Sequence, residues 1–478
     1  MNDQRIKRLI LILALPAAVL LGACAKKPSA KSELDVIQTL SPAVTPTPAP
    51  SPTPAPLVDI GGTNVSADTV TLDLTRFEFI PDVLCENSRY FRDLKEIRLG
   101  QTELANWEID RIRDSFPDAN VLWETELLGD VLPSDTAILD LSKMSEEDVE
   151  TVIALLPRFP NIRAVGMIPD SGITQLSPET VGRIRNELPN AEFHCCWELY
   201  GQLASWKTTE LRYSKQKLGN KAIASFRAVL PFLNSLELLR FYDCGITDYD
   251  SMVALKNEFP SVNVVFSVEI AGYNFMSDTV LFHCPLLRDK HTERLKYLPD
   301  ILYLDIGHNR YITNVDFIKY LPKLQIVILS ITKIKDISVL AGCPDLEYVE
   351  LLNTYIEDLT PLSGLKKIEY LNIGDMPNVK DISPIYGLTS LKMVRICMRT
   401  FNHVPKSQVS ELKAALPECF VSDGPGDPTT SGFWRFADKN HTYTERYALL
   451  RRQMLYDIPK WEDRQQNSPS RLEGDRER

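Results

Sequence analysis

The side chains that most often bind metal ions or act as nucleophiles are sparse in this chain, which has 6 histidines and 9 cysteines among 478 residues. Two groups stand out: His194 with Cys195 and Cys196, and His283 with Cys284. Because neighbouring side chains on a strand point to opposite faces of a sheet, an adjacent His–Cys pair cannot chelate an ion jointly without a bend. The two groups would have to meet in space to offer zinc its imidazole and thiolate ligands. We expect no metal ion and no cofactor.

A second set of possible ligands recurs at one position of a short repeat and consists of Asn314, Asp336, Asp358 and Asp381. Regularly spaced carboxylates suggest calcium binding or acid–base catalysis. The recurrence instead favours a structural role, since Asn and Asp side chains at bends accept hydrogen bonds from backbone N–H groups. The sequence also lacks G-x-S-x-G, H-E-x-x-H, P-loop and G-x-G-x-x-G motifs. We therefore predict a protein without catalytic residues.

The short repeat has a period of 22 or 23 residues between Leu298 and Ile396. Its copies begin at Leu298, Leu321, Cys343, Leu365 and Leu388. Two apolar residues, separated by one position, follow each start: Leu304 and Ile306, Val327 and Leu329, Val349 and Leu351, Leu371 and Ile373, Val394 and Ile396. One copy cannot bury its own apolar residues, so the copies must stack. A fixed period with L-x-x-L-x-L inside it indicates leucine-rich repeats.

The segments Leu324–Leu340 and Leu346–Leu362 fit the form L-x-x-L-x-x-L-x-L-x-x-T-x-I-x-D-I-x-x-L almost position by position. This form resembles the short repeats of internalin-type bacterial surface proteins. The resemblance covers residues 298–396 and implies a fold and a mode of binding, with protein ligands favoured. We predict an α/β leucine-rich-repeat solenoid, with a parallel β ladder, helices or turns on its convex side, and a C-terminal helical cap.

The residues between the core positions of each predicted strand face away from the core and form two rows on the concave side. The first row is Tyr303, Ile326, Tyr348, Tyr370 and Met393, and the second is Asp305, Ile328, Glu350, Asn372 and Arg395. Strands stack about 4.8 Å apart, so the first row becomes a continuous aromatic and apolar band. Such bands tend to mark binding surfaces. We predict ligand binding by these ten residues; alternatively, a neighbouring segment covers the band, or the tyrosines merely suit a strand.

A longer and less regular repeat precedes the short one. Its anchors are Phe116-Pro117, Leu188-Pro189 and Phe259-Pro260, each with a glycine twelve residues after the proline, at Gly129, Gly201 and Gly272. The apolar residues before each anchor have helical spacing, and the proline ends the predicted helix before a β-rich stretch. These units predict irregular repeat turns with outer helices. The stretch from Val121 to Ile138 fits either a turn of the solenoid or a hairpin at its edge.

The N-terminus predicts export. Arg5, Lys7 and Arg8 precede the apolar run Leu9–Leu21, which is too short to span a bilayer and suits a signal peptide. The following Leu21-Gly22-Ala23-Cys24 resembles a bacterial lipobox, which implies cleavage before Cys24 and its lipidation. Two acyl chains on one cysteine would hold the protein to a membrane. The alternative is an ordinary secretory signal with an incidental cysteine.

The remaining segments complete the predicted organisation. Alternating prolines up to Pro56 predict an extended linker. Phe433–Phe436 and a predicted helix over Thr442–Tyr456, with Thr442 and Glu445 at capping-box spacing, would cover the last open end of the solenoid. Cys343 and Cys397 suit small buried apolar positions. The net charge of -11 argues against nucleic-acid binding.

The predicted boundaries follow from these features. They are a signal peptide over 1–23, the lipidated Cys24 and proline-rich linker over 24–57, a long-repeat region over 58–275, a short-repeat region over 276–421, an aromatic and helical cap over 422–461, and a disordered tail over 462–478. We predict a lipid-anchored, extracytoplasmic bacterial surface protein that binds a protein or glycan through its concave face. The alternatives are a passive envelope scaffold without a ligand and, less favoured, an envelope hydrolase.

Overall fold

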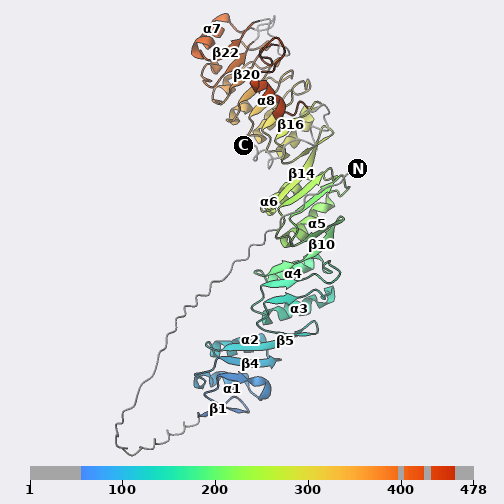
Figure 1. Ribbon diagram of the computed structural model, residues 1–478, viewed down its shortest axis with the longest axis vertical. Coiled ribbons are helices and arrows are strands. Elements are labelled where there is room, and N and C mark those ends of the chain that lie inside the picture. The colour runs from blue at the N-terminus through green and yellow to red at the C-terminus, as the bar shows by residue number, and fades with distance from the viewer. Residues whose placement is uncertain (1–54, 397–402, 425–431, 458–478) are drawn as a thin grey trace, which may run out of the picture. The chain divides into compact units, whose positions relative to one another are not determined.

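Short parallel strands alternate with helices along most of the chain (Figure 1). The computed structural model describes residues 55–396, 403–424 and 432–457. The described residues from Leu57 onward belong to one compact unit. The predicted signal peptide, Cys24, most of the linker, Cys397 and the C-terminal tail lie outside the described residues. Within the described ranges, no helix reaches the length and hydropathy of a membrane span.

The short-repeat region forms one parallel sheet of seven strands. Its strands are, in order, β16 (Leu281–His283), β17 (Tyr303–Asp305), β18 (Ile326–Ile328), β19 (Tyr348–Glu350), β20 (Tyr370–Asn372), β21 (Met393–Arg395) and β22 (Phe420–Ser422). Each strand pairs with the next one in the chain, and every pairing is parallel. The parallel ladder predicted for the five middle strands is therefore confirmed. Two further strands, β16 and β22, extend it at either end.

A short helix connects each strand of this sheet to the next. The connecting helices are η6 (Asp289–Tyr297), η7 (Asp316–Tyr320), η8 (Ser338–Gly342), η9 (Thr360–Leu362), η10 (Ser383–Ile385) and α7 (Lys406–Ala415). The apolar pairs of the repeat, such as Val349 and Leu351, are fully buried between strands and helices. Stacking thus buries side chains that one copy alone would expose.

The recurring Asn and Asp residues stabilise the bends before these helices, as predicted. Their Oδ1 atoms accept backbone N–H groups two residues later: 2.6 Å for Asn314, 2.7 Å for Asp336, and 2.8 Å for Asp358 and Asp381. Hydrogen bonds from the side chain and the backbone of Thr360 lower the pKa of Asp358, and those from the backbone and the side chain of Ser383 lower the pKa of Asp381. The ladder is a device of local structure and not a set of convergent metal ligands.

The region before Leu281 is divided into smaller sheets. The first strands are β1 (Leu57–Asp59), β2 (Asn64–Ser66), β3 (Thr71–Asp73), β4 (Glu96–Gln101), β5 (Asn120–Leu127) and β6 (Asp130–Pro133). Next come β7 (Ile138–Asp140), β8 (Ala164–Gly166), β9 (Glu192–His194), β10 (Cys196–Leu199), β11 (Gln202–Ser205), β12 (Glu210–Ser214), β13 (Leu238–Tyr242), β14 (Asn263–Ile270) and β15 (Tyr273–Met276). The helices are η1 (Leu74–Arg76), α1 (Pro81–Glu86), η2 (Ser88–Tyr90), α2 (Asn106–Ser115), η3 (Glu146–Asp148), α3 (Val149–Leu155), η4 (Leu156–Arg158), α4 (Pro178–Glu187), α5 (Lys221–Val229), η5 (Leu230–Phe232) and α6 (Tyr249–Glu258).

Three antiparallel hairpins explain the glycine that follows each proline anchor in this region. They are β5–β6, β10–β11 and β14–β15. At the first turn, Leu128 has φ 53° and Gly129 has φ 85°, and the other two turns repeat this pair of positive angles. Two positive φ values match the tight turn that suits the twist of a hairpin, and glycine adopts the second one without strain. The stretch from Val121 to Ile138 is therefore a hairpin and not a turn of the ladder.

The interior contains two large apolar clusters. One gathers residues from Val58 to Trp123, and the other extends from Leu127 to Cys419. Strand β5 contributes to both clusters, so the change of core occurs within a single strand. Every cysteine of the described residues is a buried free thiol, and Cys343 is buried as predicted.

The residues 432–457, which we call the C-terminal segment, contain helix α8 (Glu445–Gln453). The helix is shorter than predicted, because Thr444 and not Thr442 caps it: the Thr444 hydroxyl accepts the N–H of Tyr447 at 3.2 Å. The Thr442 N–H donates instead to the Asp438 carboxylate at 3.0 Å, within the loop that precedes the helix.

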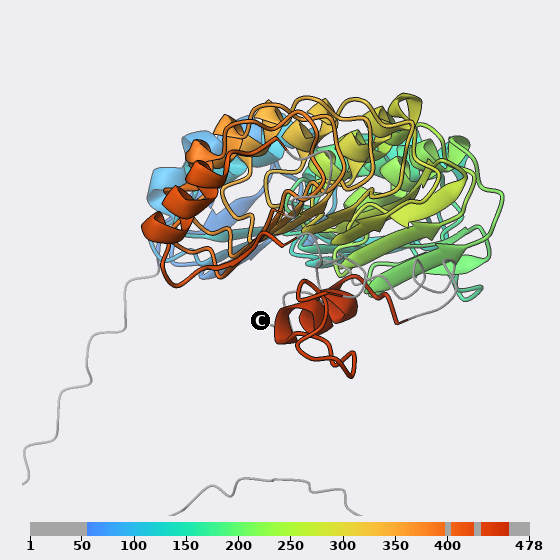
Figure 2. The same ribbon diagram turned by 90° about the horizontal axis from the view of Figure 1, so that it is seen from above.

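The position of this segment also differs from the predicted cap over the open end. The ring of Phe433 in this segment does contact the ring of Phe420 in the last strand. Its buried side chains, however, pack against the face of the seven-stranded sheet. In Figure 2, α8 (red) lies beside the strands, on the side opposite the helices that connect them. We call this side of the sheet the concave face. The predicted cap over the open end is not confirmed, and the contact matches the alternative in which a neighbouring segment covers the band of tyrosines.

Candidate functional site

All ten residues predicted to bind a ligand lie on the concave face, in two adjacent rows. In one row Tyr303, Ile326, Tyr348, Tyr370 and Met393 pair side by side. In the other, Asp305, Ile328, Glu350, Asn372 and Arg395 do the same. The parallel register places equivalent positions of successive repeats next to one another. His283 extends the second row by one strand.

The first row is covered by the C-terminal segment. Tyr348 is only 2% exposed, and Ile326 and Met393 are also buried. They form one apolar cluster with Trp434, Tyr447, Leu450 and Met454 of the segment, and Tyr303 and Tyr370 pack against that cluster. The segment therefore occupies the band on which the ligand-binding prediction rests.

Aromatic and cationic side chains of the segment dock on two tyrosines of the face. The Trp434 ring centroid lies 5.5 Å from that of Tyr348 and 6.5 Å from that of Tyr370. The Arg446 guanidinium lies over both rings, at 5.0 Å from Tyr348 and 5.8 Å from Tyr370. Contacts between a cation and an aromatic face contribute more when they are shielded from water, and Arg446 is buried.

Glu350 provides the second row with a buried hydrogen-bond acceptor. Its Oε1 accepts the indole N–H of Trp434 at 2.8 Å and also the hydroxyl of Tyr348. Burial raises the pKa of Glu350, although these hydrogen bonds and the nearby Arg435 act in the opposite direction. The ionised form is thus costly at this position unless donors surround it.

Asp305 is a second buried acceptor, and its surroundings have the opposite net effect. Burial alone would raise its pKa, but hydrogen bonds with His283, Tyr456 and the backbone of Gly307 lower it overall. His283 Nδ1 and the Gly307 N–H each lie 2.9 Å from a carboxylate oxygen. The Tyr456 hydroxyl donates to the same carboxylate. Residues of the C-terminal segment thus donate to both carboxylates of the row.

Polar groups at this contact are not all satisfied. Among the described residues, four buried atoms here have no hydrogen-bond partner: Ser330 Oγ, Asn372 Nδ2, Arg435 Nε and Arg446 Nη2. A cavity of about 260 Å³ lies between the segment and the sheet, next to Ser330 and Arg435. Its lining includes Asp305, Glu350, Ser330, Arg435 and Tyr456. The segment therefore fits the face incompletely.

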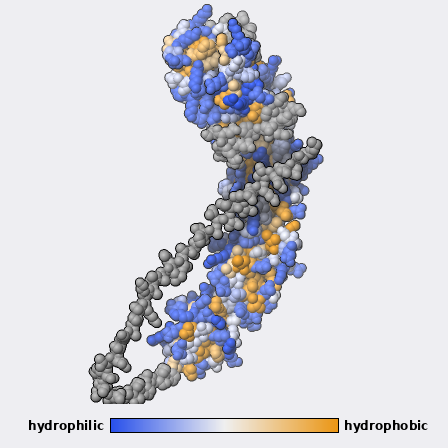
Figure 3. Space-filling view, in the orientation of Figure 1, coloured by the Kyte–Doolittle hydropathy of each residue, from blue (hydrophilic) through white to orange (hydrophobic). Residues whose placement is uncertain are grey.

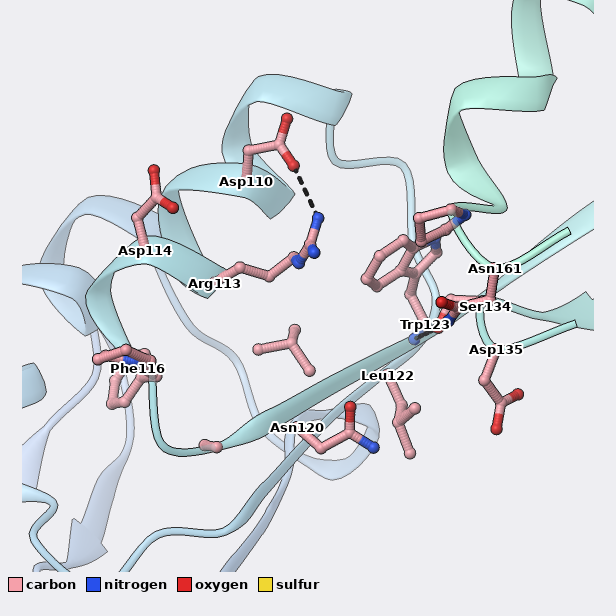
Figure 4. Close-up of a pocket in the computed structure, with 14 residues that line it drawn as sticks. Asp110, Arg113, Asp114, Phe116, Asn120, Leu122, Trp123, Ser134, Asp135 and Asn161 are labelled. Carbon is pink, nitrogen blue, oxygen red and sulfur yellow. Dashed lines mark hydrogen bonds and ion pairs between the residues drawn. The ribbon is translucent and has the colours of Figure 1, made fainter. Parts of the chain in front are cut away.

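A larger hollow of about 580 Å³ lies between α2, β5 and the loop before β8 (Figure 4). Its carboxylates Asp110 and Asp114 lie on α2 and Asp135 lies between β6 and β7, and Asp110 pairs with Arg113 at 3.2 Å. In the part of the chain that the structure describes, no three His, Cys, Asp or Glu side chains converge on a metal position. His194 stacks on Trp206, with ring centroids 3.9 Å apart, and His283 pairs with Asp305 in another sheet, so the two His–Cys groups do not meet.

Exposed apolar side chains on the rest of the described surface are scattered. Ile138, Leu203 and Trp107 are more than half exposed. In Figure 3, hydrophobic patches lie among hydrophilic ones over the part of the chain that Figure 1 labels α3 and α4. Scattered apolar groups are ordinary on protein surfaces. The concave face remains the best candidate site.

Solved structures similar to this chain are internalin-like leucine-rich-repeat proteins. Internalin C2 of Listeria monocytogenes is 22% identical over 48% of this chain and 87% of its own, with a TM-score of 0.28. An internalin of the same species, InlF, is 13% identical over 76% and 84% of the two chains, with a TM-score of 0.27. A leucine-rich-repeat protein of Leptospira interrogans is 16% identical over 74% and 95%, with a TM-score of 0.29.

No family model and no curated protein matches the chain. The function is therefore argued from the geometry of the chain itself, which is α/β with parallel strands as predicted.

The residues that complete this site were not predicted from the sequence. Trp434, Arg446 and Tyr456 supply the contacts to the face, and His283 supports Asp305. A signal for the first three existed: the segment has aromatic residues and an apolar helix stripe of Tyr447, Leu450 and Met454, which complement an apolar sheet face. Nothing in the sequence distinguishes that face from the solenoid end as the docking place.

Proposed function

We propose that this chain is a lipid-anchored, extracytoplasmic bacterial surface solenoid, without catalytic activity, that binds a protein or glycan ligand through its concave face. Export and anchoring rest on the N-terminal charges, the apolar run and Cys24. Replacement of Cys24 by serine is expected to move the protein from the membrane to the soluble fraction. Retention at the membrane by the Cys24→Ser chain would count against the lipid anchor.

One observation carries the proposed mode of binding. The concave face already holds a peptide segment, through the ring of Trp434, the guanidinium of Arg446 and hydrogen bonds to Glu350 and Asp305. Rows of aromatic side chains beside buried acceptors provide both contact area and orientation. A sheet with only a structural role would not need these aromatic rows and buried acceptors, whereas a face that binds a protein ligand would use both.

The second candidate is a passive envelope scaffold. The same contact favours it too, because a face filled by its own chain has no free area for a ligand. In that case Tyr348 and Tyr370 serve only the stability of the segment.

Capture experiments with the full chain separate these candidates. The variant Tyr348→Ser/Tyr370→Ser changes the face, and Tyr311→Ser/Tyr355→Ser is the matched control, because Tyr311 is 66% and Tyr355 46% exposed. Binding predicts that crosslinked partners are lost from the first variant and kept by the second, at a temperature where both remain folded. A large fall in melting temperature without any partner for the wild-type chain would support the scaffold.

A further inference from the structure

The C-terminal segment resembles a bound ligand in every contact it makes with the concave face. It places an indole, a guanidinium and a phenol on the two rows, and the hydrogen bonds of Trp434 and Tyr456 reach the buried carboxylates of Glu350 and Asp305. Helix α8 presents Tyr447 and Leu450 to the apolar band. The contacts of α8 are those of a short amphipathic helix docked in a groove, and Trp434 and Tyr456 add hydrogen bonds from either side of this helix.

The contact is nevertheless incomplete. In the described part of the chain, four buried polar atoms at or beside it lack a partner, and a cavity of about 260 Å³ remains under the segment. Buried polar groups without partners weaken an interface, because they lose water and gain nothing in return. A ligand that gave Ser330 Oγ or Asn372 Nδ2 a hydrogen-bond partner would avoid this cost.

We propose that residues 432–457 act as an internal competitor for the concave face, which they leave when an external ligand binds. This inference rests on the proposed function of that face. It also defines the partner: a protein segment with an arginine on a short amphipathic helix and with aromatic hydrogen-bond donors that flank this helix, as Trp434 and Tyr456 flank α8. Two acceptor carboxylates and two stacked tyrosines select these groups, since Glu350 and Asp305 need donors and the Tyr348 and Tyr370 rings attract a cation.

The expected strength of this competition follows from tethering. A short tether gives a segment an effective concentration on the order of 1 mM at its own site. If the free segment binds with a Kd of about 10 µM, a tethered copy weakens binding of an added copy about 100-fold. A substitution that weakens the contact between the C-terminal segment and the concave face should restore binding of the added copy.

The probe is a synthetic peptide with the sequence of residues 432–457, titrated by fluorescence anisotropy into full-length chains. The chain with Trp434→Ala loses the indole contacts, and Trp107→Ala is the matched control, since Trp107 is 63% exposed on α2. We expect the Trp434→Ala chain to bind the peptide at least tenfold more tightly than the wild-type and Trp107→Ala chains. A peptide with Trp434→Ala and Arg446→Ala should bind at least tenfold more weakly.

Hydrogen exchange distinguishes a variant whose C-terminal segment has loosened from a variant that has unfolded. In the Trp434→Ala chain, amides of α8 should exchange faster while those of β18 to β20 stay protected. If the strands of the Trp434→Ala chain lose protection as well, the titration uses the Tyr456→Phe chain in its place. This substitution removes only one hydroxyl. Equal binding by the loosened and wild-type chains, or no binding by either at about 1 mM peptide, overturns the proposal.

The outcomes of this experiment distinguish failure of the internal competition from failure of the proposed function. If the peptide binds the loosened chain but neither chain captures an external protein, the internal contact stands and ligand binding fails. Capture of a glycan and not of a protein by the loosened chain would overturn the partner chemistry. A wild-type dimer that becomes monomeric with Trp434→Ala would mean that the segment fills the face of a second copy, which overturns the intramolecular contact.

Discussion

At the scale of single residues, two carboxylates in one row of the concave face differ in their response to protons. Burial raises the pKa of Glu350, whereas hydrogen bonds with His283, Tyr456 and Gly307 outweigh burial at Asp305 and lower its pKa. The folded state therefore binds the Glu350 proton more tightly than the unfolded chain does. Stability linked to Glu350 rises as the pH falls from its folded pKa towards the ordinary value of 4.5.

The substitution Glu350→Gln tests this sign. Glutamine keeps the Oε1 acceptor for Trp434 and Tyr348 but has no charge to bury. We expect the variant to melt at the wild-type temperature or above it at pH 7. The difference should shrink as the pH falls towards 4.5, because the wild-type carboxyl then becomes neutral too. Thermal melts at a series of pH values measure it, and a difference that grows on acidification contradicts the prediction.

Asp305 affects stability in a separate and more acidic pH range. Its contribution is present above the ordinary value of 3.8 and is lost as the pH falls through its lower folded pKa. The two carboxylates therefore do not obscure one another in the melts. Their opposite shifts could not be predicted from the sequence, because the burial of Glu350 and the Tyr456 hydroxyl at Asp305 both depend on a segment far along the chain.

At the scale of elements, periodicity predicted the strands and failed at the docking of one helix. The rows from Tyr303 to Met393 and the Asn and Asp ladder follow from the spacing of 22 or 23 residues, since each copy repeats the same local geometry. The start of α8 at Glu445 depends on which of two threonines, Thr442 or Thr444, caps it. The contact between the C-terminal segment and the concave face depends on shape, which no local pattern encodes.

The hairpin glycines offer an element-scale prediction with a built-in control. Gly129 has φ 85° and an added Cβ would meet nothing within 4 Å, so its substitution by alanine has a purely backbone cost. We expect Gly129→Ala to lower the free energy of unfolding by about 1 kcal/mol. Gly182→Ala, inside α4 and equally unobstructed, should raise it by about 0.5–1 kcal/mol. Denaturant titrations measure both, and equal effects of the two substitutions would refute the assignment of the turn.

At the scale of the whole molecule, two apolar clusters divide the chain within β5. Val121 and Trp123 belong to the first cluster and Leu127 to the second. Polar contacts also cross the boundary: Trp123 donates to the carbonyl of Arg158 at 3.1 Å, and Arg158 donates to the carbonyls of Thr102 and Leu104. Stacked repeats interact mainly with their neighbours, so the two clusters can lose structure separately.

The substitution Ile112→Ala tests this separation. Ile112 is fully buried in the first cluster, and truncation of a buried isoleucine costs about 2–5 kcal/mol. Hydrogen exchange should accelerate in α2 and β4 and remain unchanged in β18 to β20. The matched substitution Ile306→Ala, in the second cluster, should reverse the pattern. Uniform acceleration across the chain by either variant would show a single cooperative unit.

The last strand of the ladder has a consequence for handling this protein at high concentration. Among the described strands, β22 pairs with β21 and is the last strand of the sheet. Free edges invite pairing between molecules, and short strands limit it. With three residues, β22 (Phe420–Ser422) offers a template too small for fibre growth, so purified material is expected to stay free of amyloid.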